Sequence, residues 1–164
     1  MQTIKLRKIN KSDLPYFIKW WKDKELVALT SGIYEKSDEV LKGYFFDMLS
    51  SKKDHYYMIQ EESGKIIGNI SLTHKDKNVF EIHIVIGEKE YWGRGLGTAS
   101  IKEALNVAFN KLGYNKAYLE VRPDNKRAIN AYADCGFIKA GLKKYPDNKF
   151  QPVVLKMTLA KKDF

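Results

Sequence analysis

The sequence of 164 residues has one cysteine, no apolar run long enough to span a membrane and no secretory leader pattern at its start. A single thiol, Cys135, makes neither an internal disulfide nor a multi-cysteine metal site, which excludes disulfide scaffolds and cysteine-rich metal domains. The three histidines, His55, His74 and His83, also lack metal-ligand spacing. We therefore expect a cytoplasmic protein without a metal and without a membrane partner.

Repeats, linkers and low-complexity segments are also missing, so we expect one domain over residues 1–164. Positive charge, in contrast, is in excess: 29 Lys and Arg face 20 Asp and Glu, for a net charge of +9. This excess favours a polyanionic partner such as a nucleotide cofactor or a nucleic acid, although a solvated basic surface explains it equally well. No helix-turn-helix, RNP or zinc-finger pattern is present, so a nucleic acid is not the expected partner.

The apolar patterns predict strands mixed with helices on one sheet, an α/β or α+β class. Strands are expected near residues 4–6, 56–60, 66–72, 79–86, 117–121 and 153–159. Helices are expected after Ser12 or Asp13, after Ser37, after residue 97 up to Gly113, and from residues 123–125 up to Gly136. In the helix after Ser37, the residues expected to face inward are Val40, Leu41, Tyr44, Phe45 and Met48.

The most informative segment is residues 90–98, Glu-Tyr-Trp-Gly-Arg-Gly-Leu-Gly-Thr, which lies between a strand pattern and a helix pattern. Glycine permits positive φ and close approach of the backbone to a ligand. A helix N-terminus adds free N–H groups and a partial positive charge, so the segment predicts a pyrophosphate site. Neither the dinucleotide GxGxxG pattern nor the GxxxxGK[ST] pattern fits, because Thr98 stands where the former needs its last glycine.

Residues 92–97 resemble the motif Q/R-x-x-G-x-G/A of the GCN5-related N-acetyltransferase (GNAT) superfamily, with Trp92 in place of Gln or Arg. The variant Tyr-Trp-Gly-Lys/Arg-Gly, which residues 91–95 match, is common in the branch with ribosomal-protein, spermidine and some aminoglycoside acetyltransferases. Residues 125–137 resemble the family's second signature, N-x-x-A-x-x-x-Y-x-x-x-G-F, through Asn125, Tyr132 and Gly136. The order of elements is also similar from about residue 6 to residue 159.

The resemblance implies a single mixed, mostly antiparallel sheet, flanked by helices, with a splay between the parallel strands 79–86 and 117–121. It implies acetyl-CoA as the acetyl donor, with its diphosphate on the N–H groups of residues 93–98 and its pantetheine arm on free backbone near residues 84–86. The residues implied in binding it are Ile84, Val85, Ile86, Trp92, Gly93, Arg94, Gly95, Leu96, Gly97, Thr98, Asn125 and Tyr132.

Acetyl transfer to an amine needs a deprotonated amine, a stabilised oxyanion and an acid for the departing thiolate. The resemblance implies that Tyr132 is this acid. Alternation along residues 79–86 places Glu81 and His83 on one face of the strand, and Glu81 is the candidate base. Three alternatives remain open. Glu81 forms a structural ion pair, His83 is the base or shapes the acceptor pocket, or the reaction has no dedicated base. Cys135 is not expected to act as a nucleophile, because it stands at a helix C-terminus.

The resemblance also implies that residues 20–35 form much of the acceptor site. Aromatic rings there, beside Asp23, Glu25 and Glu35, suit an ammonium group, although packed rings and solvated acids fit equally well. We expect a small primary amine or a protein N-terminus as the acceptor, with a polyamine or an aminoglycoside as the alternative, and a homodimer as one assembly to test. Alternatives of another class are a basic nucleic-acid-binding module and an acyl-CoA sensor without catalysis.

Overall fold

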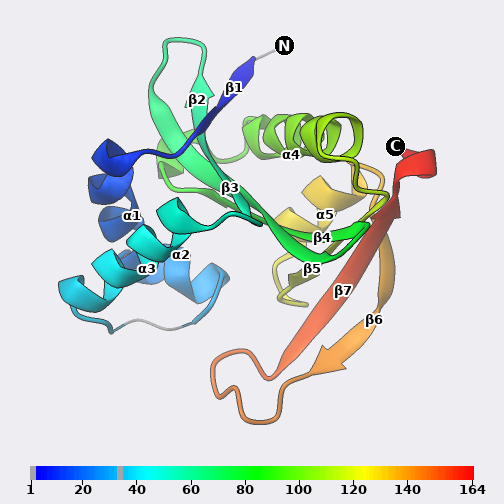
Figure 1. Cartoon of the computed structure of the whole chain (residues 1–164). Coiled ribbons are helices and arrows are strands. Elements are labelled where there is room, and N and C mark those ends of the chain that lie inside the picture. Colours follow the sequence, from blue (N-terminus) through cyan, green and yellow to red (C-terminus); the bar gives the residue numbers. More distant parts are fainter. Residues whose placement is uncertain (1–2, 33–34) are drawn as a thin grey trace.

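The computed structural model describes residues 3–32 and 35–164. In that part of the chain, seven strands form one sheet in the order β1-β2-β3-β4-β5-β7-β6 (Figure 1). The strands are β1 (Ile4–Lys8), β2 (His55–Glu61), β3 (Ile66–Asp76), β4 (Val79–Ile86), β5 (Lys116–Val121), β6 (Ile138–Lys144) and β7 (Val153–Ala160). Only β4 and β5 pair in parallel, and the other neighbours are antiparallel. The predicted mixed, mostly antiparallel sheet is confirmed.

The two parallel strands separate halfway along their length. Their pairing ends at Glu81 and Tyr118, although β4 continues to Ile86 and β5 to Val121. Backbone N–H and C=O groups on this edge of β4 therefore lack a neighbouring strand, and such groups need other partners. The splay predicted between these strands is confirmed.

Helices cover both faces of the sheet (Figure 1). On one side lie α1 (Leu14–Trp21), α2 (Lys24–Leu29) and α3 (Asp38–Ser50), which share a smaller core with Met58 of β2. On the other side lie α4 (Leu96–Asn106), which continues as a π-helical turn (Val107–Lys111), and α5 (Lys126–Ala133). This second side forms the larger core with Phe80 and Ile82 of β4. None of the helices in the described part of the chain has the length and apolarity needed to cross a membrane.

Several local expectations were wrong. Val40 and Tyr44 of α3 are exposed, because this outer helix contacts its neighbours along a narrow stripe that buries only Leu41 and Phe45. Asp13 stands at the N-cap of α1, but its carboxylate accepts hydrogen bonds from Arg7 and from the N–H of residue 10 instead of capping that helix.

Two elements were not predicted. Helix α2 is short, and it begins where the carboxylate of Asp23 accepts the N–H groups of Glu25 and Leu26. Strand β6 escaped prediction because every one of its residues is exposed, so it carries no alternating buried face.

Candidate active site

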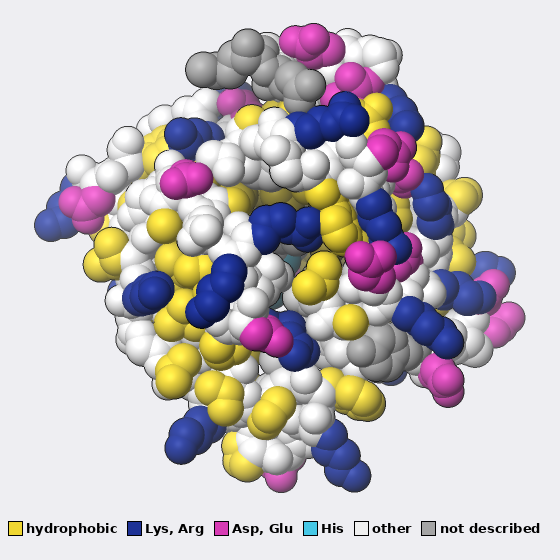
Figure 2. Space-filling model, turned by 180° about the vertical axis from the view of Figure 1, so that it is seen from behind, with side chains coloured by type: hydrophobic (Ala, Val, Ile, Leu, Met, Phe, Trp, Pro, Cys, Tyr) yellow, Lys and Arg dark blue, Asp and Glu magenta, His cyan; other side chains and the backbone are white. Residues whose placement is uncertain are grey.

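A cleft of about 860 Å³ opens where β4 and β5 separate. Its lining comes mainly from helices α1 to α5, from strands β2, β3, β4, β5 and β7, from residues 90–98, here called the glycine loop, and from the loop between β6 and β7. Figure 2 shows a hollow on this face of the molecule, with Lys and Arg side chains around its mouth. The volume lies within the range of roughly 300–1,000 Å³ that is usual for small-molecule sites.

The glycine loop forms one wall of the cleft. Gly93 and Gly95 have φ of +74° and +76°, a conformation that favours glycine. A Cβ atom at either position would meet no atom within 4 Å, so the space beside the loop is open. Gly95 is the N-cap residue of α4 and has no side chain that could cap the helix. The first hydrogen bond of the helix joins Ala99 N to Gly95 O (3.0 Å). The N–H groups of residues 96–98 are therefore free to bind an anionic group.

Trp92 connects this loop to β4. Its indole Nε1 donates a hydrogen bond to the carbonyl oxygen of Ile86 (2.8 Å). The guanidinium of Arg127 lies 3.9 Å from the centre of the indole ring, and both residues line the cleft. Sequence reasoning missed Arg127, although it stands in the first turn of α5, two residues after Asn125. The aromatic residue thus anchors the loop and positions a cation beside it.

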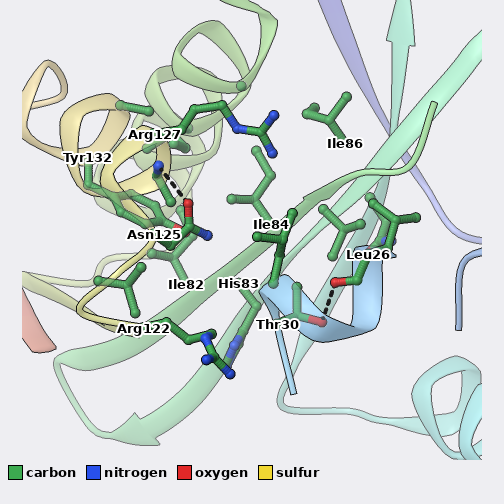
Figure 3. A pocket seen from close by; sticks show the side chains of 18 of the residues that line it. Leu26, Thr30, Ile82, His83, Ile84, Ile86, Arg122, Asn125, Arg127 and Tyr132 are labelled. Atoms are coloured by element: carbon green, nitrogen blue, oxygen red, sulfur yellow. Dashed lines mark hydrogen bonds between the residues drawn. The ribbon is translucent and has the colours of Figure 1, made fainter. Parts of the chain in front are cut away.

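The other predicted cofactor-binding residues lie as follows. Ile84, Val85 and Ile86 line the cleft along the unpaired edge of β4, and so do Gly97 and Thr98 at the start of α4. Asn125 also lines it, and its side chain caps α5 by accepting the N–H of Ala128 (3.2 Å; Figure 3). The side chain of Arg94 is not among those that line the cleft; its guanidinium lies 5.2 Å from the ring centre of Tyr91. Arg94 is thus the one predicted cofactor-binding residue that does not line the cleft.

Tyr132 lies on the α5 side of the cleft, beside Asn125 (Figure 3). The residue is 7% exposed and packs against Phe137, with 5.9 Å between the ring centres. Burial raises the pKa of Tyr132 above its ordinary value, because the low-dielectric surroundings disfavour the phenolate. Its hydroxyl forms no hydrogen bond with another described residue. The raised pKa keeps this hydroxyl protonated, which a proton donor requires.

Glu81 lies on the face of β4 that it shares with His83 and Val85. The other face of β4 packs into the larger core, which contains Tyr132. Its carboxylate pairs with Lys75 (2.7 Å), accepts the hydroxyl of Tyr118 (3.2 Å) and lies 3.6 Å from His83 Nε2. Burial opposes its ionisation, but His83 and Lys75 outweigh that effect and lower the pKa of Glu81 to about 2. A carboxylate with so low a pKa accepts a proton weakly. This arrangement favours the ion-pair interpretation of Glu81.

Glu120 is a second carboxylate on this face that sequence reasoning missed. It lies on β5 two residues beyond Tyr118, which pairs with Glu81, and so its side chain shares the face of Glu81. Glu120 lines the cleft and accepts the hydroxyl of Tyr145 (2.7 Å) and the ammonium of Lys143 (3.1 Å). The available signal was the alternation of apolar and polar residues along 117–121, which places Tyr118 and Glu120 on one face.

Two interpretations were open for residues 20–35, and the one with an acidic ammonium site is not assembled on the cleft. Asp23 and Glu25 both pair with Lys89, at 2.9 and 2.7 Å, and neither lines the cleft. Glu35 is exposed and also absent from the lining, while residues 33–34, which belonged to that expectation, lie outside the described residues. Trp20 does line the cleft, but it is buried in the smaller core and its Nε1 donates to Glu88 (3.0 Å).

Cys135 is buried beside the start of α4, with Sγ 3.6 Å from the carbonyl oxygen of Thr98. Burial raises the pKa of the thiol to about 11, so it stays protonated at neutral pH. This environment agrees with the expectation that Cys135 is no nucleophile.

Comparison with known proteins places these features in a family. The family model of the acetyltransferase (GNAT) domain matches residues 3–138. The chain is 27% identical over 110 residues to the spermidine N(1)-acetyltransferase of Vibrio cholerae, a match that covers 66% of this chain and 62% of that protein. It is 29% identical over 99 residues to the N-alpha-acetyltransferase RimI of Mycobacterium tuberculosis, covering 58% and 60%. The chain thus spans about three fifths of the length of these curated relatives.

Solved structures share the whole fold. The spermidine N-acetyltransferase from Vibrio cholerae, in complex with CoA and spermine, superposes with a TM-score of 0.86 at 21% identity, over 98% of this chain and 96% of that one. The aminoglycoside acetyltransferase AAC(6')-Ib, in complex with ribostamycin and coenzyme A, superposes with a TM-score of 0.84 at 22% identity, over 99% and 96%. With the family model matching most of its length, the chain belongs to the GNAT acetyltransferase family.

Proposed function

We propose that this protein is an N-acetyltransferase that moves an acetyl group from acetyl-CoA to a primary amine by direct attack in a ternary complex. The observation that carries the proposal is the splay of β4 and β5, which opens onto a glycine loop with free N–H groups. The open space beside Gly93 and Gly95 fits a diphosphate, and Arg127 supplies a cation next to it. The free edge of β4 near residues 84–86 fits an amide-rich arm.

When bound, acetyl-CoA supplies a thioester whose carbonyl carbon accepts the amine. The N–H groups of residues 96–98 and Arg127 hold its negative charge, while the backbone of β4 orients its arm. Tyr132 donates its hydroxyl proton as the C–S bond breaks and the new C–N bond forms. The amine approaches from the face of Glu81, His83 and Glu120, across the splay from Tyr132.

We propose that Glu81 takes part in removing the amine proton through His83. The ionised Glu81 carboxylate, 3.6 Å from His83 Nε2, stabilises the imidazolium that forms when His83 accepts the proton. The side chain of His83 is 53% exposed and lines the cleft, so an incoming amine reaches it. Glu120 is the second candidate, because its carboxylate also faces the cleft. Comparing the pH profiles of kcat/KM for Glu81→Gln and Glu120→Gln distinguishes the two candidates.

Thiol release from acetyl-CoA, followed with a panel of amines, tests the proposal together with calorimetry of acetyl-CoA binding. Tyr132→Phe should lower kcat by about 100-fold, the lower range for general acid catalysis, while the Kd of acetyl-CoA changes less than about threefold. Equal turnover in Tyr132→Phe and the unmodified protein would remove this residue from the mechanism. Heat of binding without turnover on any amine would favour a sensor, and absence of both would overturn the proposal.

A peptide N-terminus as acceptor and a homodimeric assembly are the finer parts of the proposal. Intact-mass measurement of short peptides after incubation with acetyl-CoA tests the first, through a gain of one acetyl group at the α-amine. Sedimentation velocity over a range of protein concentrations tests the second. RNA binding that falls steeply with salt, without affinity for acetyl-CoA, would instead support the nucleic-acid alternative.

A further inference from the structure

The two carboxylates on the acceptor side of the cleft are each paired with a lysine. Lys75 of β3 lies 2.7 Å from Glu81, and Lys143 of β6 lies 3.1 Å from Glu120. Neither lysine lines the cleft, so each approaches its glutamate from outside. The glutamate side chains are only 9% and 16% exposed, and the lysine side chains are 40% and 51% exposed. The carboxylates therefore reach the cleft with their charge already compensated.

Few other acidic groups are available to a cationic acceptor. Within residues 3–32 and 35–164, the one further carboxylate that lines the cleft is Asp134, which follows α5 and precedes Cys135, the residue in contact with Thr98 at the start of α4. It thus belongs to the half of the cleft assigned to the acetyl donor. Two cations, Arg122 and Arg127, line the cleft as well. Figure 3 shows Arg122 on the same side as His83.

The part of the cleft wall that β3 forms carries uncharged polar groups instead of acidic ones. Asn69 and Ser71 of β3 line the cleft and lie opposite Val85 and His83 in the β3–β4 register. Ser71 is only 8% exposed. Neither the Asn69 amide nor the Ser71 hydroxyl is hydrogen-bonded to another side chain or backbone group of the described chain. Two such groups at the wall of a cleft are available to an uncharged hydrogen-bonding ligand.

We propose that the acceptor carries one positive charge, at the amine that is acetylated, and that an amide or hydroxyl group of its body binds Asn69 and Ser71. Lys75 and Lys143 then determine specificity by excluding polycationic amines. This inference rests on the proposed function. Each further ammonium group of a polyamine would lose water without gaining an unpaired carboxylate, and it would lie near a lysine that already holds the glutamate. The chain would thus differ from the relatives whose names refer to spermidine or aminoglycosides.

A series of amines with the same four-carbon arm tests this selection. Butylamine, 1,4-diaminobutane and spermidine differ in their number of ammonium groups, and an N-terminally free dipeptide amide adds amide groups to a single ammonium. We expect kcat/KM for acetyl-CoA-dependent thiol release to fall at least tenfold from butylamine to spermidine, and to be higher for the dipeptide amide than for butylamine. A kcat/KM that rises along the series to spermidine would overturn the inference.

Removing one lysine tests its role directly. Lys143→Met frees the Glu120 carboxylate and should raise the ratio of spermidine to butylamine kcat/KM at least fivefold. Lys139→Met is the matched control: it removes the same charge from the same strand, but Lys139 is exposed and forms no ion pair with a described residue. We expect the control to leave the ratio unchanged. Equal ratios in both variants would show that Lys143 does not select the acceptor.

Asn69→Ala separates hydrogen bonding from charge selection. It should lower the ratio of dipeptide amide to butylamine kcat/KM at least fivefold, and an unchanged ratio would remove Asn69 from acceptor binding.

Failure of the inference is distinguishable from failure of the function. Acetyl-CoA binding with preferential turnover of spermidine overturns only the inference, whereas no binding heat and no thiol release with any of the four amines overturns both.

Discussion

Gly95→Ala separates the conformational role of the glycine loop from its role in ligand binding. Gly95 has a φ of +76°, and placing an L-residue in this left-handed conformation costs about 1–2 kcal/mol. Since no atom lies within 4 Å of the added Cβ, no steric cost inside the protein is added. For a chain of this size, 1 kcal/mol lowers Tm by roughly 2–4 °C, so we expect a loss of about 2–8 °C.

The same methyl group should weaken acetyl-CoA binding, because Gly95 lines the cleft and caps the helix whose free N–H groups we assign to the diphosphate. We expect the Kd to rise at least about tenfold, which corresponds to roughly 1.4 kcal/mol. Differential scanning calorimetry measures the first effect, and titration calorimetry with acetyl-CoA measures the second.

Gly113→Ala is the matched control. Gly113 has a φ of +79° and likewise no atom within 4 Å of an added Cβ, but it follows the C-terminal turn of the same helical segment and is absent from the cleft. The control should lose a similar Tm and keep the Kd of acetyl-CoA within about twofold. If the two variants had the same Kd, the glycine loop would be a structural turn and its assignment to the diphosphate would be refuted.

Three further predictions follow from single contacts. Trp92→Phe loses the hydrogen bond to Ile86 O (2.8 Å), so we expect about 1 kcal/mol lower stability in urea unfolding and a weaker Kd for acetyl-CoA; an unchanged Kd would separate the anchor from the binding site. Because the pKa of Glu81 is lowered from 4.5 to about 2 on folding, its ionisation stabilises the fold above pH 4.5, and that stabilisation is lost as the pH falls towards 2. Urea unfolding between pH 3 and 6 should therefore show a smaller pH dependence in Glu81→Gln than in the unmodified protein, and equal slopes would contradict the ion-pair assignment. Cys135→Ala should keep kcat within about twofold, whereas a large loss of turnover in the folded variant would restore the thiol to the mechanism.

The parts of the site that the sequence determined are local in the chain. The glycine loop, the cap at Asn125 and the position of Tyr132 follow from short motifs, because backbone conformation and helix caps depend on residues a few positions apart. The bounds of β4 followed from alternation over residues 79–86, since a half-buried strand shows a period of two. Through the family resemblance that the short motifs carry, they also predicted the mixed sheet and its splay.

The acceptor side was decided by tertiary structure. Lys89 compensates Asp23 and Glu25, Lys75 compensates Glu81, and Lys143 compensates Glu120, across strands or between separate elements. Which cation reaches which carboxylate depends on strand order and register, and β6, which carries Lys143, left no buried pattern in the sequence. Composition showed an excess of positive charge, but only the folded arrangement shows where that charge meets the acids of the cleft, because Coulomb interactions depend on distance in space and on burial.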